Sequence, residues 1–421
     1  MMDALGQAGS DYRWNYYSQG FSGKDIQASI TDMIAFLNLA QQYIEHSLRV
    51  NKRSDNLYHT YNTLRLNDKS ASVKHLYEML EGQAAILSSG LLSGEESLAL
   101  LESLRQSPLY RADQHSYILY PDRQLPGFLE KNRMTSDQVS DLALVLKLVE
   151  DENKTLFVKD EDDYYHFSSH IRNLKDVTRL LDALKEQPQY AELVKTDAVK
   201  IESLFEDIFQ HAEFTGRSGT FFAYEGLGSI YWHMVSKLLL AVQETIIRTR
   251  SESTTCALMD KYADIRKGLS FNKTAENYGA FPTDPYSHTP KGQGAKQPGM
   301  TGLVKEELLT RQAELGYFIE NGNLVFDFLM LDRSEFLATP TVFNYFDIDG
   351  QPQQIDLEAG SLAYSICQTP VILQPSNEDR ITVHFTNGSI QQVKGYVLDS
   401  VNSGHIFKRD GVIQHLTVSI A

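Results

Sequence analysis

The chain is divided by the stretch Tyr278–Gly302, which reads YGAFPTDPYSHTPKGQGAKQPGMTG. Its prolines remove backbone N–H donors and fix φ, and its glycines add conformational freedom, so neither a helix nor a central strand can run through it. Long loops without secondary structure are uncommon in compact domains, and the usual reasons are function or disorder. Disordered segments lack aromatic residues, whereas this stretch carries several. We therefore interpret it as the wall of a binding site, with a structural crossover as the alternative.

Upstream of this stretch, the hydrophobic pattern predicts a helical region. Apolar residues recur at helical spacing from 25 to 50, which predicts one buried stripe along a long amphipathic helix. Ser93 is followed three positions later by Glu96, the capping-box signature of a helix start. On similar grounds we expect helices near 72–88, 93–106, 136–148, 173–186 and 197–210. Antiparallel helix pairs with site-forming loops at one end predict an α/α toroid.

Downstream, one more helix precedes a change of pattern. This helix is expected to open at Thr301-Gly302 and to end at Gly316, where a glycine suits the C-cap. From Phe318 onward apolar residues alternate between four turn signals: Asn321-Gly322, Asp349-Gly350, Asn387-Gly388 and Asp410-Gly411. We therefore predict a mainly α chain with a C-terminal β domain. An α/α toroid, complete or incomplete, would cover 1–317, and an antiparallel β-sandwich or sheet would cover 318–421.

The composition is that of a globular protein and argues against several partners. Of 421 residues, 42% are hydrophobic and 22% are charged, which is near the usual mix. The formal net charge of -16 disfavours nucleic acid and anionic membranes, because phosphate groups are bound by clustered Lys and Arg. Only Cys256 and Cys367 are present, so neither a disulfide framework nor a cysteine zinc site is supported. We expect a cytoplasmic protein with no metal site and no cofactor.

A second unusual stretch, 214–233, reads FTGRSGTFFAYEGLGSIYWH and leads into a mostly apolar helix. A glycine-rich loop at a helix start leaves backbone N–H groups that can bind an anion. Arg217 adds a planar fork of donors that suits a phosphate or a carboxylate. The alternative is close helix packing through small residues. The stretch matches no dinucleotide or P-loop fingerprint, so nucleotide binding is only weakly supported.

Three short motifs carry a family resemblance. They are Gly299-Met300-Thr301-Gly302 before the last helix, Glu314-Leu315-Gly316 at its end, and Gly322-Asn323-Leu324-Val325-Phe326 at the entry to the β domain. With this layout the chain resembles the C-terminal half of the glycoside phosphorylases related to cellobiose and chitobiose phosphorylase, which have an (α/α)6 barrel and a small β domain. The resemblance implies that Thr301 and Gly302 bind phosphate, assisted by His288 and by Gln293 or Gln297. It also implies inorganic phosphate as a co-substrate, and either a homo-oligomer or a missing N-terminal half.

The predicted chemistry is inverting cleavage of a glycosidic bond in an oligosaccharide. Cleavage needs a carboxylic acid at the leaving oxygen, and inversion needs a second carboxylate to activate water or a bound phosphate as nucleophile. The family's Gly-Asp-Trp-Asn-Asp loop is absent from this sequence, which is a departure from the phosphorylase pattern. The two unusual stretches each contain a carboxylate, and either carboxylate could instead cap a turn. Our candidates are Asp284, as the acid, and Glu225. Tyr278, Tyr286 and Trp232 are candidates for stacking on sugar rings, although a buried Trp is more often part of the core.

Two further functions remain open from the sequence. One is a noncatalytic carbohydrate-binding module, in which the loops bind sugar but no carboxylate pair flanks it at the separations that glycosidases use. The other is a structural lobe that completes a larger toroid. An exposed apolar flank on the first long helix would favour the structural lobe.

Overall fold

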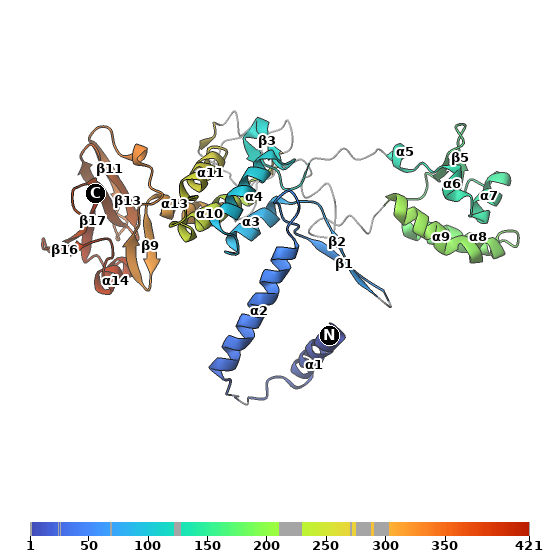
Figure 1. Cartoon of the computed structure of the whole chain (residues 1–421), viewed down its shortest axis with the longest axis horizontal. Coiled ribbons are helices and arrows are strands. Elements are labelled where there is room, and N and C mark those ends of the chain that lie inside the picture. Colours follow the sequence, from blue (N-terminus) through green and yellow to red (C-terminus); the bar gives the residue numbers. More distant parts are fainter. Residues whose placement is uncertain are drawn as a thin grey trace. The chain divides into compact units, whose positions relative to one another are not determined.

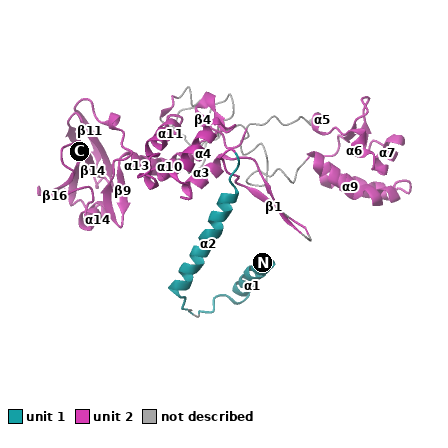
Figure 2. Ribbon diagram, viewed as in Figure 1, with its two compact units in different colours: residues 1–54 teal, residues 55–421 magenta. Residues whose placement is uncertain are grey.

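The computed structural model describes residues 2–23, 25, 27–67, 70–121, 128–209, 230–269, 272–274, 288–289 and 303–420. Two compact units divide the chain, Met1–Ser54 and Asp55–Ala421, and Figure 2 shows them in different colours. The boundary that the sequence places between 317 and 318 stays a prediction, because both sides of it belong to the second unit.

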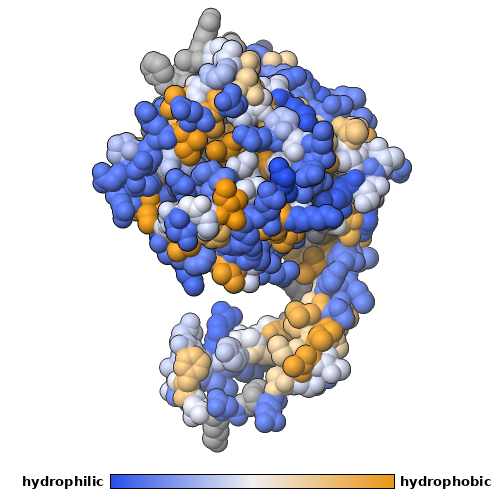
Figure 3. Space-filling model, turned by 90° about the vertical axis from the view of Figure 1, so that its left-hand side faces the viewer, coloured by the Kyte–Doolittle hydropathy of each residue, from blue (hydrophilic) through white to orange (hydrophobic). Residues whose placement is uncertain are grey.

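The first unit consists of two helices, α1 (Met2–Gln19) and α2 (Ile30–Val50). The long helix expected over 25–50 is confirmed as α2, and the side chain of its N-cap Ser29 accepts a hydrogen bond from the Asp32 backbone N–H. Its predicted buried stripe is absent, because no residue described in α2 is buried. Phe36 is 69% exposed and Leu37 is 60% exposed. Figure 3 shows such apolar residues in orange on the surface of this unit.

The second unit contains a helical group whose central member is α10 (Trp232–Arg248). This helix contacts α3 (Leu80–Ser88), α4 (Gly94–Gln106), α11 (Thr255–Lys267) and α13 (Leu303–Glu314), as Figure 1 shows. A helix that is apolar around most of its circumference must be covered on several sides. Accordingly most of α10 is buried, including Trp232, Leu238 and Ile246. The capping box that Ser93 and Glu96 predict at the start of α4 is confirmed.

Residues 128–209 form a module with a core of its own. Its helices are α5 (Phe128–Lys131), α6 (Ser136–Val139), α7 (Ala143–Glu150), α8 (Leu174–Lys185) and α9 (Ala191–Phe209), and a two-stranded sheet pairs β5 (Phe157–Lys159) with β6 (Tyr165–Phe167). Phe157, Phe167 and Phe205 pack together in the core. The carboxylate of Asp197 is buried and accepts the Leu144 backbone N–H at 2.7 Å, which satisfies a donor at the start of α7.

The C-terminal part is built from hairpins and one larger sheet. The hairpins pair β9 (Tyr317–Glu320) with β10 (Asn323–Phe326), and β11 (Thr341–Phe346) with β12 (Pro352–Leu357). The larger sheet has the order β13-β14-β17-β15-β16. Its strands are β13 (Leu362–Ile366), β14 (Thr369–Pro375), β15 (Arg380–Phe385), β16 (Ile390–Lys394) and β17 (Ile413–Ile420), and α14 (Ser400–Lys408) precedes the last. Leu373, Val383 and Leu416 are fully buried in its core.

Turn chemistry explains most of these hairpins. Asn321 and Gly322 have φ of 50° and 80° between β9 and β10, which fits the predicted Asn-Gly turn. The signals at Gly350 and Gly388 also lie in hairpins. The fourth signal was misassigned, because Asp410-Gly411 joins α14 to β17 rather than two strands. At the end of α13 the expected C-cap is confirmed, since Gly316 has φ 74°.

Several sequence expectations are wrong in detail. The region 72–88 is not one helix: β1 (Asn62–Leu66) pairs with β2 (Ala71–His75), and only then does α3 begin. The helix expected over 136–148 is broken between α6 and α7. The C-terminal sheet is not purely antiparallel, because β14 and β17 pair in parallel. A toroid is not confirmed by the described helices, and the chain is a mainly helical protein with small sheets and one five-stranded sheet.

Candidate functional site

A short strand pair joins the two unusual stretches of the sequence. In the described residues, β7 (Ile230–Tyr231) pairs antiparallel with β8 (His288–Thr289), with Ile230 opposite Thr289 and Tyr231 opposite His288. These two segments lie more than fifty positions apart in the chain. Since α10 begins directly after β7, the pairing joins β8 to the residues at the start of the central helix. The two stretches that sequence analysis selected independently therefore meet at one place.

Most predicted site residues lie outside the described residues. These are Asp284, Glu225, Gln293, Gln297, Thr301, Gly302, Arg217, Tyr278 and Tyr286. The backbone of His288 lies in β8, opposite Tyr231. Thr301 and Gly302 are the two residues that precede the first residue of α13, Leu303, in the sequence. The catalytic and binding roles of all these residues stay predictions.

Trp232 is fully buried at the start of α10. The Nζ atom of Lys273 lies 5.3 Å from the centroid of the indole ring, within the range of a cation–π contact. The same ammonium group donates a hydrogen bond to the backbone carbonyl of Gln114. Burial lowers the pKa of Lys273 to about 8. Trp232 thus has the core setting that the sequence left as the alternative, and its role in sugar stacking stays a prediction.

A small hairpin places a second buried cation near Lys273. It consists of β3 (Tyr110–Arg111), the 3₁₀ turn η1 (Ala112–Gln114) and β4 (Ser116–Tyr117). Arg111 is 9% exposed and donates to the Asp113 carboxylate through Nε at 2.9 Å and through Nη2 at 3.0 Å. These hydrogen bonds lower the pKa of Asp113. Two buried cations thus lie beside one turn, and the carboxylate of Asp113 neutralises one of them.

A glycine keeps this hairpin close to α11. A Cβ atom added at Gly268, the C-cap of α11, would lie 1.9 Å from the backbone carbonyl oxygen of His115. No real side chain tolerates such a contact, so only glycine permits this approach. The ring of His115 also contacts the Asp264 carboxylate of α11 at 3.1 Å. The turn that carries Gln114 and Asp113 is therefore fixed to the end of the helix.

A series of polar side-chain contacts connects β7 with the first turn of α13. The hydroxyl group of Tyr231 lies 3.3 Å from Nδ1 of His233, and Nε2 of His233 lies 3.5 Å from Oε1 of Glu306. Glu306 is 1% exposed. Burial lowers the pKa of His233, although the nearby Glu306 carboxylate opposes this effect.

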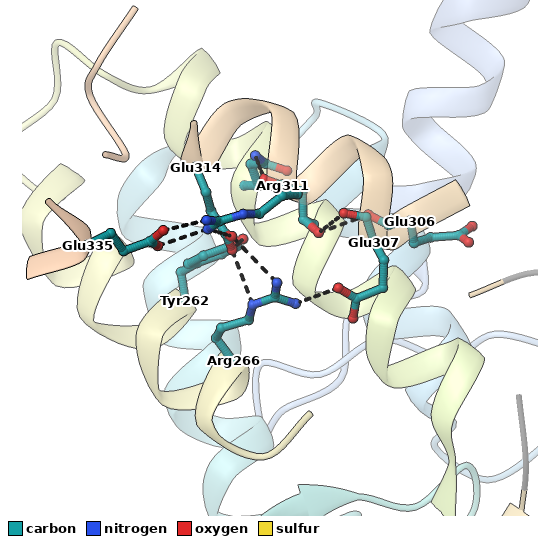
Figure 4. A network of polar contacts seen from close by, with 9 residues as sticks. Tyr262, Arg266, Glu306, Glu307, Arg311, Glu314 and Glu335 are labelled. Carbon is teal, nitrogen blue, oxygen red and sulfur yellow. Dashed lines mark hydrogen bonds and ion pairs between the residues drawn. The ribbon is translucent and has the colours of Figure 1, made fainter. Parts of the chain in front are cut away.

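A buried ionic network also holds α13 against the neighbouring helix, as Figure 4 shows. Arg266 of α11 contacts Glu307 at 2.9 Å and Glu314 at 3.2 Å, and the Tyr262 hydroxyl donates to Glu314 at 2.6 Å. Burial is the main reason that the pKa of Tyr262 is raised. Arg311 extends the network to Glu335 in the 3₁₀ turn η3 (Arg333–Glu335). Because α13 starts directly after Thr301-Gly302, the network holds in place the helix that the predicted phosphate-binding pair opens.

Sequence reasoning missed three charged residues of this region. In the sequence Glu306 lies in the first turns of a helix, where a carboxylate suits the dipole and needs no catalytic role, and its burial is not visible there. Lys273 has no motif around it. Arg111 lies in a segment of polar residues between tyrosines, 110–122, whose composition resembles that of the central loop, and this is the only signal that could have identified it. Among the described residues, no three His, Cys, Asp or Glu side chains are grouped as metal ligands.

Comparison with known proteins identifies one part of the chain. Residues 125–212 match the family model described as GH149 phosphorylase insertion domain 2, and this range contains the module 128–209. The match supports a GH149-type, phosphorylase-like relationship. It suggests a carbohydrate-active protein, which agrees with the predicted relation to glycoside phosphorylases in general. The specific resemblance to cellobiose and chitobiose phosphorylase stays a prediction. No curated protein matches the chain. None of the described helices is long and apolar enough to cross a membrane.

Proposed function

We propose that this chain is a glycoside phosphorylase acting on an oligosaccharide, with inorganic phosphate as co-substrate. The observation that supports the proposal is the pairing of β7 with β8, because Ile230 and Tyr231 follow Glu225 closely in the sequence and His288 follows Asp284. The phosphorylase insertion-domain match supports the same reaction class. Lys273, against the Trp232 ring at the start of α10, adds a buried positive charge near this strand pair.

The proposed reaction is a single inverting displacement. Asp284 donates its proton to the leaving glycosidic oxygen while that carbon–oxygen bond breaks. An oxygen of inorganic phosphate attacks the anomeric carbon from the opposite face and forms the new carbon–oxygen bond. The products are a sugar 1-phosphate and a shortened saccharide. Thr301, Gly302 and His288, with Gln293 or Gln297, are the proposed phosphate ligands. Arg217 is a further candidate.

The test is phosphate-dependent turnover of a panel of β-linked disaccharides, with Asp284→Asn measured beside the parent. Asp349→Asn is the control, because this carboxylate lies in the exposed turn between β11 and β12. The proposal expects sugar 1-phosphate from the parent and from the control but not from Asp284→Asn. Sugar release without phosphate dependence would indicate a hydrolase, with Glu225 as the candidate base. Equal turnover by all three proteins would remove Asp284 from the mechanism.

The noncatalytic alternative is favoured by α2. Within its own unit, α2 leaves Met33, Leu37 and Ile44 more than half exposed. These residues form one face of the helix, and a soluble protein rarely leaves such a face uncovered. In this alternative the chain is a carbohydrate-binding or structural lobe, and α2 packs on the remainder of a larger phosphorylase-like protein. Two results together would support this alternative. The chain alone would bind disaccharides without turning them over, and adding the remainder of the larger protein would produce activity.

A further inference from the structure

Glu306 combines deep burial with an unsatisfied oxygen atom. Its side chain is 1% exposed, and Oε1 contacts Nε2 of His233 at 3.5 Å and Nζ of Lys305 at 3.4 Å. The other oxygen, Oε2, is buried and has no hydrogen-bond partner in the described part of the chain. Burying a carboxylate oxygen without a donor is costly, so such an atom in a folded protein requires an explanation.

The packing of α13 does not explain this burial. Glu306 and Thr310 are both 1% exposed, whereas Leu308 is 61% exposed on the same helix. Hydrophobicity alone would turn the leucine inward and the carboxylate outward. The helix dipole does not explain it either, because the dipole stabilises an exposed first-turn carboxylate equally well, as at Glu95 of α4. Something other than helix stability therefore favours a carboxylate facing inward at 306.

The ionic network behind α13 does not satisfy Glu306. Figure 4 shows its carboxylate directed away from Arg266 and Glu314, and no dashed line reaches its carboxylate oxygens. Besides the neighbouring Lys305, the carboxylate contacts His233, which lies at the start of α10, two positions after the residue that pairs with His288. Glu306 therefore contacts a residue that closely follows the β7–β8 strand pair.

The chemistry of this place selects a neutral ligand that donates hydrogen bonds. An ionised carboxylate repels a phosphate group at close range. A metal ion would need more ligands, and no group of three suitable side chains is present in the described ranges. Hydroxyl groups of a sugar are neutral donors, and a charged acceptor strengthens their hydrogen bonds. This step rests on the proposed function, which supplies a saccharide as substrate.

We propose that Oε2 of Glu306 accepts a hydrogen bond from a hydroxyl group of the bound saccharide. His233 acts as a positioning residue, since its Nε2 lies 3.5 Å from Oε1 of Glu306 and its Nδ1 lies 3.3 Å from the Tyr231 hydroxyl group. The three side chains form one line from β7 to α13 and orient the carboxylate before substrate binds. The ligand class is therefore a saccharide with a free hydroxyl group at this position.

The test measures disaccharide dissociation constants by calorimetry in the absence of phosphate. Glu306→Gln removes the charge but keeps the shape, and loss of a charge-assisted hydrogen bond is expected to weaken binding roughly 10- to 100-fold. Glu306→Asp keeps the charge but withdraws the carboxylate, and it is expected to weaken binding as well. Glu95→Gln is the control, because it removes a first-turn carboxylate from an exposed position. Melting temperatures of all variants report the fold separately.

Monodeoxy analogues of the disaccharide identify the hydroxyl group. One analogue should bind the parent more weakly than the full sugar, yet bind Glu306→Gln about as well as the full sugar does. Normal affinity in Glu306→Gln would overturn this inference but not the proposed function. A lowered melting temperature of the same variant would then show that Glu306 is structural. No saccharide binding by the parent would overturn both the inference and the proposed function.

Discussion

Tyr231 lies directly opposite His288 in a two-residue ladder, although 57 positions separate them in the chain. Directly opposite residues in an antiparallel pair have their Cβ atoms about 4.5–5.5 Å apart, whereas a shift of one residue places the side chains on opposite faces. This ladder is the structural link between the two stretches that sequence analysis interpreted as binding-site walls. Its register can be tested directly.

We expect a disulfide bond in the double variant Ile230→Cys with Thr289→Cys, because this pair is in register. The chain with Cys256→Ser and Cys367→Ser provides a cysteine-free background. The mismatched variant Ile230→Cys with His288→Cys is the control and should remain reduced. Mass spectrometry of protease fragments before and after reduction gives the answer. Cross-linking of the mismatched pair in preference to the matched pair would show that the register is wrong.

How well the sequence predicted each element depended on how local its cause is. The capping box at Ser93 and the Asn-Gly turn at 321–322 act within a few residues, and both were predicted correctly. The hairpin of β1 and β2 was missed because its connection carries no glycine signal, and α14 was missed because Gly404 interrupts a short helical pattern. The parallel pairing of β14 with β17 joins segments separated by two strands and a helix, so no local pattern encodes it.

The candidate site shows the same limit. The two loop stretches were visible because proline, glycine and aromatic residues stand out in sequence. The burial of Glu306 was not visible, because it depends on which face of α13 meets α10, and the exposed Leu308 reverses the usual hydrophobic signal. Burial of Lys273 against Trp232 likewise arises from tertiary contacts between segments that sequence periodicity does not connect.

Arg266 should contribute strongly to stability through its buried partners. It is 9% exposed and contacts Glu307 and Glu314, of which Glu314 is 8% exposed. Arg266→Met removes the cation from Glu307 and one of two cations from the buried Glu314, which keeps Arg311, so we expect a loss of about 2–4 kcal/mol of unfolding free energy, near the lower end of the range for breaking a buried pair. Urea unfolding followed by Trp232 fluorescence, in a Trp14→Phe background, measures this cost. A loss below about 1 kcal/mol would contradict a buried ionic network.

The control for that experiment is Arg179→Met. Arg179 is 74% exposed and contacts Asp176 at 2.9 Å on the surface of α8. An ion pair whose cation stays in solvent, as here, is worth about 0–1 kcal/mol, although the Asp176 carboxylate is only 16% exposed. The two substitutions delete the same chemical group, so the difference between them isolates the effect of burial.

The stacked rings of His384 and His415 predict acid sensitivity of the C-terminal sheet. Their centroids are 4.0 Å apart and their planes differ by 13°, across neighbouring strands β15 and β17. Burial, and then the charge of His384, lowers the pKa of His415 to about 4 from its ordinary value of 6.5. The unfolded chain therefore binds a proton more readily than the folded chain between these values. Stability from this group is complete above pH 6.5 and is lost as the pH falls toward 4.

Melting temperatures at pH 7 and pH 4.5 measure this effect. Carboxylates contribute to any acid loss in the parent, so the informative quantity is the difference between the parent and His415→Gln. We expect the variant to lose less stability than the parent over this pH range. His46→Gln, on the exposed surface of α2, should behave as the parent does. An identical acid response in His415→Gln and the parent would exclude this histidine as the cause.

The module 128–209 should fold when it is expressed alone as residues 125–212, the range of the family match. All buried residues of its hydrophobic core come from within it, and the Lys131 ammonium group donates to the Phe209 carbonyl at 3.0 Å, which joins its two ends. We expect cooperative thermal unfolding by circular dichroism.

Within this module, Asp197→Ala should lower the unfolding free energy by about 1–3 kcal/mol, because it leaves the buried Leu144 N–H without an acceptor. Asp182→Ala, at an exposed position of α8, should change it little. A fragment without a cooperative transition would mean that the module depends on the rest of the chain for its stability.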